Sequence, residues 1–593
     1  MPLTQEQIAQ QQKQAEEILF SGPQTLGFAK GLFFGHFNAP LLFPYPVLPP
    51  GQREAVERKV DEVRRFMEQE VDSAAIDRDA DIPPQVVAGF ARLGVLGMTA
   101  PPEYGGLGFN QYAACKVMEV IGGQDAGVAV FINAHHSIGI RALLLFGTEE
   151  QKRRWLPPLV RGDQLAAFAL TEPQAGSDAA NVQTTATPTS DGRTYILNGE
   201  KRYITNGGIA QVLTVMARTP VPGSGETKVT AFLVTPDMPG FEVVEARMPK
   251  TGIRGTATAR LAFHDMPVPA ENVLGQVGKG LRVALTVLDF GRTTFGASCT
   301  GAAKACLRAA VRHANTRVQF KQKLGEFELV KKKIAYMAAC AFAMEATTAQ
   351  CAAFIDRGSE DYMLETAMLK VWSTDALWQV VNDTIQIYGG QAYFTNEPYE
   401  RWMRDARINM IGEGANDVLR AFIALVGMRG VGEQLKGVLD AFTNLRGQPL
   451  KELGTLWRFG RSQVEDLLTV PDVPVHSEAL RAPARRLARR VRDFGQAVQR
   501  LLRQYQLAIL QKQYLQERVA DAACELYASA CTLSRLDHLL TDGNGNADEV
   551  RRGLAAGRYF LTLANRRIQQ NLAALWANDD ELTTATADAF LRR

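Results

Sequence analysis

What the sequence lacks already excludes several classes of protein. It has only seven cysteines in 593 residues, and none of them are spaced as CxxC. An odd number of cysteines, mostly among small apolar neighbours, argues against a disulfide framework and against a cysteine-ligated metal. We therefore expect reduced thiols in the core and no metal site.

The chain also lacks a strong charge imbalance and an evident targeting segment. Its formal net charge is +3, with 22% charged residues, which gives no whole-molecule reason to bind nucleic acid. The N-terminal residues MPLTQEQIAQQQKQAEEIL are acidic and glutamine-rich where a signal would need a basic start. No apolar run approaches the roughly 18 residues that span a bilayer. The expected location is the cytoplasm, either soluble or on the inner face of the membrane.

The hydrophobic pattern changes several times along the chain. Residues 19–50 mix glycine, proline and phenylalanine without a period, which indicates an arm packed along another surface. Apolar spacings of three and four predict helices from about residue 53, and again from 280 to 430. Between them, short runs rich in Val, Thr, Ile and Phe alternate with turn residues and predict strands.

A chain of this length needs about three to four domains to bury its apolar surface efficiently. The fold class we predict is mainly α with a central β-domain. The predicted segments are an N-terminal arm (1–52), an N-terminal helical domain (53–165), a central β-domain (166–272), a helical bundle (273–432) and an appended helical domain (433–593).

One stretch stands out as a candidate ligand site. Residues 168–178, FALTEPQAGSD, read as the end of a strand that runs into a turn with clustered backbone donors and hydroxyl groups. Such a turn can hold a ring edge and a phosphate. On its own, the stretch is more typical of the start of an unliganded β-hairpin.

Further motifs follow in a fixed order, and together they resemble the acyl-CoA dehydrogenase family. They are PPEYGGLG at 101–108, KRYITNG at 201–207, RVQF at 317–320, QIYGG at 386–390, RDAR at 404–407 and IGEGAND at 411–417. The segments GFAKGLFFGHFNAPLLFPYP and QKQYLQERVADAACELYASACTLSR resemble the very-long-chain and ACAD-nine type. This resemblance implies a helical domain, a β-barrel-like domain, a helical bundle and an appended helical domain, with FAD between the β-domain and the bundle.

The resemblance also implies two groups of FAD contacts. One would surround the flavin ring, where Tyr203 replaces the usual tryptophan and keeps a stacking ring. Its members are Phe168, Leu170, Thr171, Ser177, Tyr203, Thr205, Ala415 and Asn416. The other would hold the pyrophosphate and adenosine, partly across a dimer interface, and consists of Arg317, Phe320, Gln386, Gly389 and Gly390.

The predicted reaction is α,β-dehydrogenation of a long- or very-long-chain acyl-CoA to the trans-2-enoyl-CoA of fatty acid β-oxidation. Glu413 matches the family's base, which removes the α-proton, and the backbone at this position donates to the thioester carbonyl. Some relatives carry the base immediately before the helical arginine that matches Arg292, but here Gly291 occupies that position. The implied substrate contacts are Ser177, Asp289, Arg292 and Gly414.

Two positions depart from the family pattern. Gly412 stands where an aromatic residue usually lines the pocket, and Ala415 stands where a threonine usually contacts the flavin. Both changes enlarge the site without removing the base. They leave room for an ACAD-nine-like assembly or scaffold role, and the flavin motifs also fit an acyl-CoA oxidase that uses oxygen.

The C-terminal region suggests further partners. A basic amphipathic helix begins near Ala484, and its apolar stripe runs through Leu487, Val491, Phe494, Val498, Leu501 and Tyr505. Such a helix can lie on an anionic membrane or pack inside a domain. The interval 451–475, which matches a membrane-associated segment of relatives, is not strongly amphipathic. The resemblance further implies a homodimer and electron-transfer flavoprotein as the electron acceptor.

Overall fold

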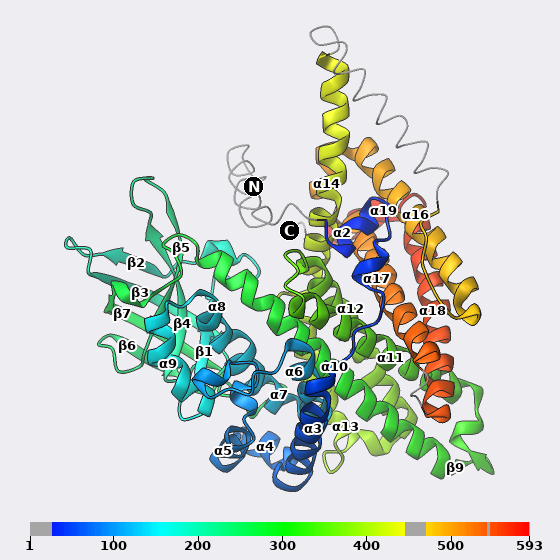
Figure 1. The fold of residues 1–593 in the computed structure, drawn as a ribbon, viewed down its shortest axis with the longest axis horizontal. Helices are drawn as coiled ribbons and strands as arrows, with labels where there is room; N and C mark the ends of the chain where they lie inside the picture. Colours follow the sequence, from blue (N-terminus) through cyan, green and yellow to red (C-terminus); the bar gives the residue numbers. More distant parts are fainter. Residues whose placement is uncertain (1–25, 445–469, 543–545, 592–593) are drawn as a thin grey trace.

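The computed structural model describes residues 26–444, 470–542 and 546–591. Figure 1 shows the strands of the central sheet gathered at one end of the molecule and long helices filling most of the rest. The predicted fold class is confirmed: a helical N-terminal part, a central sheet, a helical bundle and further C-terminal helices. The predicted domain boundaries themselves stay predictions.

The N-terminal helical part precedes the sheet. Its helices are α3 (Pro50–Glu70), α4 (Ser73–Asp79), α5 (Pro84–Arg92), α6 (Gln111–Gly122), α7 (Ala126–Ile132), α8 (Arg141–Phe146) and α9 (Glu149–Arg161). A π-helical segment, η4 (Asn133–Ile140), joins α7 to α8 without a break. Such segments are rare and often occur at functional sites.

The central sheet has eight strands in the order β6-β7-β3-β2-β4-β5-β8, with β1 paired in parallel to β4. The strands are β1 (Ala166–Ala169), β2 (Thr185–Pro188), β3 (Thr194–Ile204), β4 (Val212–Pro220), β5 (Thr227–Val234), β6 (Phe241–Glu245), β7 (Ala259–Pro269) and β8 (Val273–Leu274). The pairing of β3 with β7 changes register between Lys201 and Ile204, and this irregularity contains Tyr203.

Long helices form the rest of the molecule, with a two-stranded hairpin between the first two. They are α10 (Gly280–Thr316), α11 (Glu328–Asp356), α12 (Met363–Tyr388), α13 (Tyr399–Arg407), α14 (Asn416–Asn444), α16 (Arg481–Tyr505), α17 (Gln513–Thr541), α18 (Ala547–Ala574) and α19 (Asp580–Leu591); the hairpin is β9 (Val318–Gln319) with β10 (Gln322–Lys323). Short 3-10 helices are η1 (Ala39–Leu41), η2 (Val95–Gly97), η3 (Pro102–Tyr104), η5 (Ala179–Asn181), η6 (Ala270–Asn272), η7 (Leu324–Glu326), η8 (Gly389–Tyr393), η9 (Ile408–Met410), η10 (Glu478–Leu480) and η11 (Gln506–Gln511).

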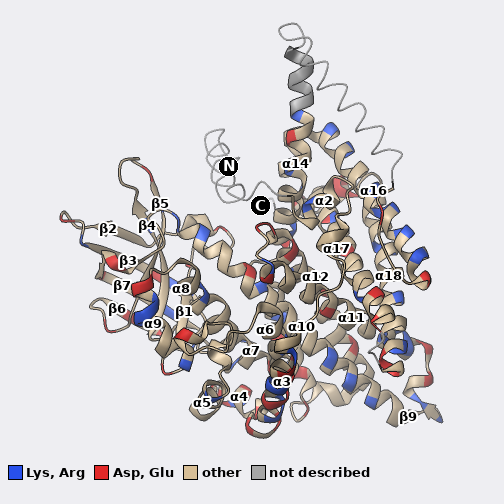
Figure 2. Ribbon diagram, viewed as in Figure 1, with Lys and Arg blue, Asp and Glu red and all other residues tan. Residues whose placement is uncertain are grey.

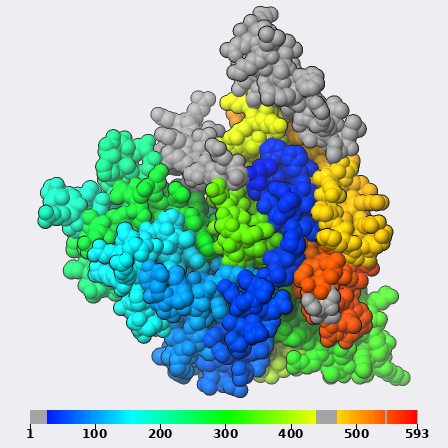
Figure 3. Space-filling view, in the orientation of Figure 1, coloured from blue at the N-terminus to red at the C-terminus, as the bar shows by residue number. Residues whose placement is uncertain are grey.

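The described part of the N-terminal arm packs on the C-terminal helices. Its short helix α2 (Phe28–Phe33) buries Phe33 against Phe494 of α16, with 5.1 Å between the ring centroids. In Figure 3 this dark blue segment lies beside the yellow and orange C-terminal helices. The expectation of an arm that packs along another surface is confirmed for these residues.

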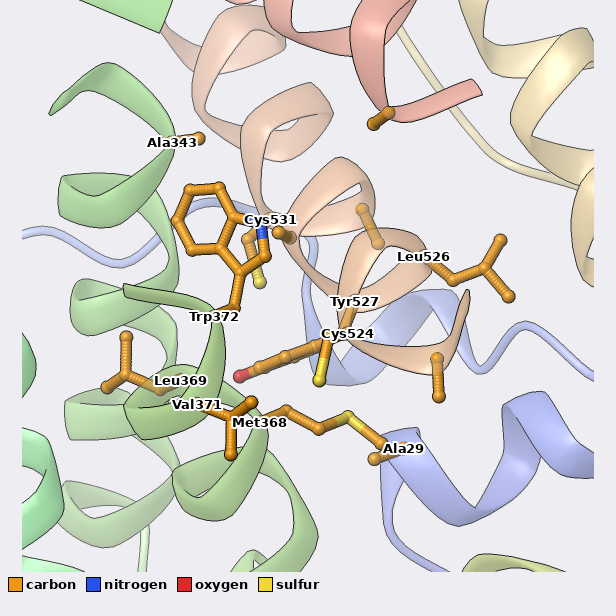
Figure 4. Close-up of a cluster of buried hydrophobic side chains, with 14 of the residues drawn as sticks. Ala29, Ala343, Met368, Leu369, Val371, Trp372, Cys524, Leu526, Tyr527 and Cys531 are labelled. Carbon is orange, nitrogen blue, oxygen red and sulfur yellow. The ribbon is translucent and has the colours of Figure 1, made fainter. Parts of the chain in front are cut away.

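The largest core joins the bundle to the appended helices. In Figure 4, Ala29 of α2, Ala343 of α11, Trp372 of α12 and Tyr527 of α17 meet in one cluster. All seven cysteines are buried and free, as predicted. Fully burying side chains of this size contributes roughly 1.5–3 kcal/mol each, so the appended helices are integral to this core.

One sequence expectation about membranes needs correction, and one that was left open is settled by packing. Helical stretches at Ala126–Phe146 and Glu328–Asp356 are long and apolar enough to span a bilayer. However, 72% and 78% of these stretches, respectively, are buried inside the molecule, so core packing accounts for their apolar character. The stripe of α16 is likewise buried apart from the half-buried Tyr505, so it packs inside the domain. Most of the interval 451–475 lies outside the described residues.

Candidate active site

The loop that carries Glu413 lies between η9 and α14. Glu413 and Gly414 both have left-handed backbone angles, with φ of 56° and 98°. The buried Lys370 of α12 holds this loop, because its Nζ donates to Gly414 O at 2.7 Å and to Asn416 Oδ1 at 2.8 Å. A non-glycine residue in the left-handed region is strained, and such strain persists only where the surroundings hold it.

The two oxygens of the Glu413 carboxylate have different surroundings. Oε1 accepts a 2.7 Å hydrogen bond from Nδ2 of Asn133 in η4. Oε2 is buried and has no hydrogen-bond partner in the described part of the chain. Burial raises the pKa of Glu413 to about 7, although Arg292, Lys370 and the Asn133 hydrogen bond all act to lower it. The carboxylate is therefore close to half-ionised at neutral pH.

Gly291 of α10 makes room for this carboxylate. A Cβ atom at this position would lie 2.9 Å from Glu413 Oε2 and 3.1 Å from Ile138 Cγ2. The position that carries the base in some relatives therefore faces the same space that Glu413 fills here. Of the three atoms nearest to that Cβ position, two belong to the Glu413 carboxylate.

Asp289 and Arg292 form a buried ion pair beside the base. Arg292 Nη1 donates to Asp289 Oδ1 at 3.2 Å, and Thr366 Oγ1 donates to the same oxygen at 2.8 Å. Burial raises the pKa of Asp289 to about 6, with Arg292 acting against the rise. The pair lies inside the bundle, so its expected contact with the CoA moiety stays a prediction.

The backbone at Glu413 offers a donor that the fold leaves unused. Gly412 N donates to Ile408 O at 2.9 Å. Helical backbone hydrogen bonds resume where Leu419 N donates to Ala415 O. Between them, the N–H of Glu413 donates to no partner among the described residues. A free N–H next to a buried carboxylate suits a substrate carbonyl that gains negative charge.

A second buried pair holds the FALTEPQAGSD turn. Lys201 Nζ of β3 donates to Glu172 Oε1 at 2.6 Å and to Leu170 O at 3.1 Å. Glu172 also accepts from the backbone of Thr184 at 3.0 Å. Burial would raise the pKa of Glu172, but Lys201 and these donors outweigh it and lower the pKa. This pair fixes the start of the turn on the strand that carries Tyr203.

The residues expected to hold the flavin ring present a fitting surface. Tyr203 is 57% exposed in a left-handed conformation, and the Arg202 guanidinium lies 4.8 Å from its ring centroid. Ser177 is exposed, Thr171 and Thr205 are half-buried, and Phe168 is buried at the end of β1. An exposed aromatic face beside hydroxyl-bearing loops fits a planar heterocycle such as isoalloxazine.

The second predicted group of FAD contacts lies elsewhere. Its five members lie at the ends of α10 and α12, and all five are exposed. The two helix ends meet there, because His313 stacks on Tyr388 with 4.1 Å between the ring centroids. Phe320 is 89% exposed. Arg317 follows Arg292 by 25 residues along α10, a rise of about 37 Å. In Figure 1 the adjoining hairpin β9 lies at the opposite end of the molecule from the sheet.

A small, largely apolar cavity lies beside the residue that bonds to Glu413. It has about 50 Å³ of space and lies where the turn between α6 and α7 meets α10, α12 and α13. Asn133 forms part of its wall. Small residues dominate the lining, among them Gly122, Gly123, Ala126, Ala129, Ala302 and Ala305.

The sequence analysis missed three contributors to this site. Asn133 and Lys370 contact the Glu413 loop, and Glu172 pairs with Lys201. The available signal was the run NAHHS at 133–137, a polar interruption in an otherwise apolar helix. Buried polar residues need partners, so such a run indicates a site of hydrogen bonding.

Comparison of the sequence with models of protein families identifies the family of this chain. Models of the acyl-CoA dehydrogenase N-terminal, middle and C-terminal domains match residues 54–163, 167–266 and 278–427. A model of the ACAD9/ACADV C-terminal domain matches residues 478–589. The chain belongs to the acyl-CoA dehydrogenase family. It is therefore an FAD-dependent oxidoreductase that dehydrogenates acyl-CoA.

Individual relatives of this dehydrogenase extend over nearly its whole length. The human very long-chain specific acyl-CoA dehydrogenase is 36% identical over 562 residues, which cover 93% of this chain and 84% of the human protein. A probable acyl-CoA dehydrogenase of Mycobacterium tuberculosis is 33% identical over 99% of this chain and 92% of its own. A Bacillus anthracis acyl-CoA dehydrogenase crystallised with FAD is 27% identical, with a TM-score of 0.76 over 95% of both chains.

Proposed function

We propose that this dehydrogenase oxidises long-chain acyl-CoA thioesters and that Glu413 takes the α-proton. The observation that carries this proposal is the Oε2 atom of Glu413, which is buried and has no hydrogen-bond partner among the described residues. A base with a pKa of about 7 is partly ionised at neutral pH and still accepts a proton readily.

The same loop also supports the charge that develops on the substrate. As the α-proton leaves, the thioester oxygen becomes enolate-like, and the free N–H of Glu413 is available to donate to it. Lys370 holds the loop through Gly414 O, which keeps this donor and the carboxylate in a fixed relation. Pre-organised donors of this kind need no rearrangement during the reaction.

The cofactor supplies the acceptor for the β-hydrogen, which leaves the substrate as hydride. Phe168, Leu170, Thr171, Ser177, Tyr203 and Thr205 would hold its ring, and Ala415 and Asn416 would line the side near the base. The Lys201–Glu172 pair keeps the turn that carries four of these residues attached to β3. Our proposal assigns the chain's own residues to binding, orientation and proton removal.

We propose that a long acyl chain extends toward this cavity. Its small lining residues leave room that bulkier side chains would close. A Cβ at Gly412 would have only one neighbour within 4 Å, Ile408 O at 3.7 Å, so the missing aromatic leaves open space. We expect activity to rise from octanoyl-CoA to palmitoyl-CoA.

Anaerobic reduction of the bound flavin tests this proposal. Palmitoyl-CoA should bleach the flavin absorbance of the wild-type protein, and Glu413→Gln should lose that reaction while it retains bound flavin. If no acyl-CoA of any length reduced the wild-type flavin, the desaturase assignment would fail and an ACAD-nine-like scaffold role would take its place. Equal bleaching in Glu413→Gln would show that another group is the base.

We also propose that the enzyme works as a homodimer with a shared cofactor site. Arg317 lies about 37 Å along α10 from Arg292, farther than one extended FAD molecule can reach. A second copy related by twofold symmetry can bring its own Arg317 group to this chain's flavin site. The exposed Phe320 would then be covered.

Mixed dimers provide a sharp test of the shared site. Glu413→Gln and Arg317→Glu should each be inactive alone, while co-expression should restore about a quarter of the sites, because one site of each mixed dimer is intact. If Arg317 acted within its own chain, no mixture would regain activity. A monomer in analytical ultracentrifugation would also contradict the proposal.

Electron-transfer flavoprotein is the acceptor that we propose for the reduced enzyme. Stopped-flow reoxidation should be fast with this flavoprotein and slow in air-saturated buffer. The opposite order would identify an acyl-CoA oxidase. The matched control is Glu413→Gln reduced with dithionite, because its reoxidation does not involve the base.

We place the enzyme in the cytoplasm, with peripheral contact at the inner membrane face. Leu507 is 79% exposed in η11, directly after α16, whose Arg485, Arg486 and Arg489 are exposed. Figure 2 shows the basic residues along α16 and α18. Anionic vesicles should therefore sediment the protein in low salt and release it in high salt, and Leu507→Glu should weaken binding. If the protein bound no vesicle, membrane contact would be contradicted and a soluble enzyme would be favoured.

A further inference from the structure

A row of buried polar side chains leads away from Glu413 into the N-terminal helices. The contacts join η4, α10 and the segment between η2 and η3, three parts of the chain that are remote in sequence. The row consists of Arg141, Thr99, His136, Ser137, Thr294, Asn133 and finally Glu413.

The donors in the outer half of this row point in one direction. Arg141 has only donors, and its Nη2 lies 2.7 Å from Thr99 Oγ1, which therefore accepts. Thr99 then donates its hydroxyl hydrogen to Nε2 of His136 at 2.9 Å, and its backbone N–H lies 3.3 Å from the same nitrogen. With Nε2 accepting, a neutral His136 carries its hydrogen on Nδ1 and donates to Ser137 Oγ at 3.2 Å.

The inner half is organised by the Thr294 hydroxyl. Thr294 Oγ1 donates to Ser137 Oγ at 3.1 Å, and it also lies within reach of Phe290 O and Gly291 O of its own helix, at 3.2 and 3.0 Å. The shortest contact of the Thr294 hydroxyl is with Asn133 Oδ1, which needs a donor. This contact turns the amide of Asn133 so that Nδ2 faces Glu413 Oε1 at 2.7 Å. Thr294 therefore joins Ser137 to Asn133, and the contacts are continuous from Arg141 to Glu413.

Burial makes this arrangement costly to reverse. Thr294 and Ser137 are fully buried, and His136 and Asn133 are 1% and 4% exposed. Burial also lowers the pKa of His136 well below its usual value, which keeps the imidazole neutral and its tautomer defined by its partners. A flipped Asn133 amide would place Oδ1 against a carboxylate and leave two acceptors facing each other.

We propose that this hydrogen-bond chain, from Arg141 to Asn133, positions the Glu413 carboxylate so that Oε1 is held and Oε2 is the atom that takes the α-proton. The proposal rests on Glu413 being the base. Asn133 is a positioning residue, because it acts through Glu413 and an amide does not pass a proton along. The chain therefore fixes geometry and charge, and it is not a proton wire.

The charged groups near Glu413 are few, so the contribution of Asn133 can be isolated. Arg292, which pairs with Asp289, acts on it from α10, and Lys370 acts on it from α12. The nearest thiol is Cys299, whose pKa burial raises to about 12. These groups stay unchanged when Asn133 or Thr294 is substituted.

The test uses 3-thiapalmitoyl-CoA with the FAD-loaded enzyme. Its sulfur replaces the β-carbon, so the ligand can lose the α-proton but cannot transfer a hydride. The resulting enolate gives a long-wavelength band with the flavin, and the pH midpoint of this band reports proton transfer to the base. In Asn133→Leu, the loss of a charge-assisted hydrogen bond should raise the pKa of Glu413 and move the pH dependence by about one to two units.

Matched variants on α10 make the result specific. Thr294→Val should move the midpoint in the same direction by a smaller amount, and Thr294→Ser should restore it. Thr300→Val is the control, because the Thr300 hydroxyl bonds only to Gly296 O of its own helix, at 2.9 Å, and is equally buried. If Asn133→Leu fails to fold, the Thr294 pair decides the question.

The possible outcomes separate this inference from the assignment of the base. An unchanged midpoint in folded, flavin-loaded Asn133→Leu and Thr294→Val would overturn the role of the chain and leave Glu413 as the base. A normal band in Glu413→Gln would instead overturn the base assignment. The expected result is no band in Glu413→Gln and shifted midpoints in the two chain variants.

Discussion

Two buried glutamates show how one side chain serves opposite purposes in this molecule. Glu172 is paired with Lys201 at 2.6 Å and accepts backbone hydrogen bonds, so its pKa is lowered. Glu413 has one amide donor and one bare oxygen, so burial raises its pKa to about 7. The first holds a turn in place, and the second is poised to accept a proton.

The two regions differ in how far ion pairs and hydrogen bonds offset the desolvation of the carboxylate. Around Glu172 the fold supplies a full set of partners, which stabilises the ionised form. Around Glu413 the cations Arg292 and Lys370 stay near, but Oε2 receives no donor. A buried carboxylate becomes reactive when the fold leaves one of its oxygens to the substrate.

The largest expected effect comes from removing the carboxylate of Glu413. Glu413→Gln keeps the shape of the side chain, so the protein should fold and retain flavin. Loss of a general base should lower the rate of flavin reduction by about 10²–10⁴-fold. Rapid-mixing absorbance with palmitoyl-CoA measures this rate, and a fall of less than tenfold would contradict the comparison.

Breaking the Lys201–Glu172 ion pair should affect the stability of the fold rather than the chemical step. Lys201→Met leaves the Glu172 charge buried without its partner, which should cost about 3–5 kcal/mol of unfolding free energy. Denaturant unfolding and flavin content both report the loss.

The double variant Lys201→Met/Glu172→Gln is the control for the pair. It removes both charges, so it should recover most of the lost stability. If the double variant were as unstable as the single one, the cause would be packing and not the unpaired charge.

A third prediction separates stability from activity at one position. Gly291→Ala should favour helix α10 by about 1 kcal/mol, but its Cβ would crowd Glu413 Oε2. We expect a rate reduced about tenfold by displacement of the base, without loss of flavin.

Gly432→Ala is the matched control, because a Cβ at this helical position meets nothing within 4 Å. This variant should be at least as stable as the wild type and fully active. A Gly291→Ala enzyme with normal activity would contradict the tight placement of the carboxylate.

The smallest effect concerns the pH dependence of stability. Because the pKa of folded Glu413 is raised to about 7, its contribution to stability is complete at acidic pH and is lost as the pH rises through 7. Glu413→Gln has no such loss, so its Tm should exceed that of the wild type by about 1–3 °C at pH 8. The two curves should converge below about pH 4.5, where the unfolded chain also binds this proton. Calorimetry across this range measures the difference, and a wild type with the higher Tm at pH 8 would contradict the prediction.

The fold class was predictable because each region has a clear pattern. The strands from Ala166 to Leu274 and the long helices after Gly280 follow their hydrophobic periods. The position of Glu413 was indicated by an ordered set of motifs. In contrast, Asn133 lies 280 residues from Glu413, and only packing of η4 against the α10–α12 region brings the two together.

The error about apolar stretches and the choice left open for α16 have a common physical cause. Ala126–Phe146 and Glu328–Asp356 are apolar on most sides because several helices surround them, and α16 is amphipathic because one face meets a core. Helices buried in a large protein and helices at membranes satisfy the same pattern. Only the tertiary neighbours distinguish them.

One measurement tests the account most directly: the rate of flavin reduction by palmitoyl-CoA as a function of pH, with and without deuterium at the α-carbon. Glu413 must be ionised to take the proton, so the rate should rise with pH through a midpoint near 7, and deuterium should slow it. A wild-type rate that is independent of pH from 5 to 9, or insensitive to α-deuterium, would contradict Glu413 as the base.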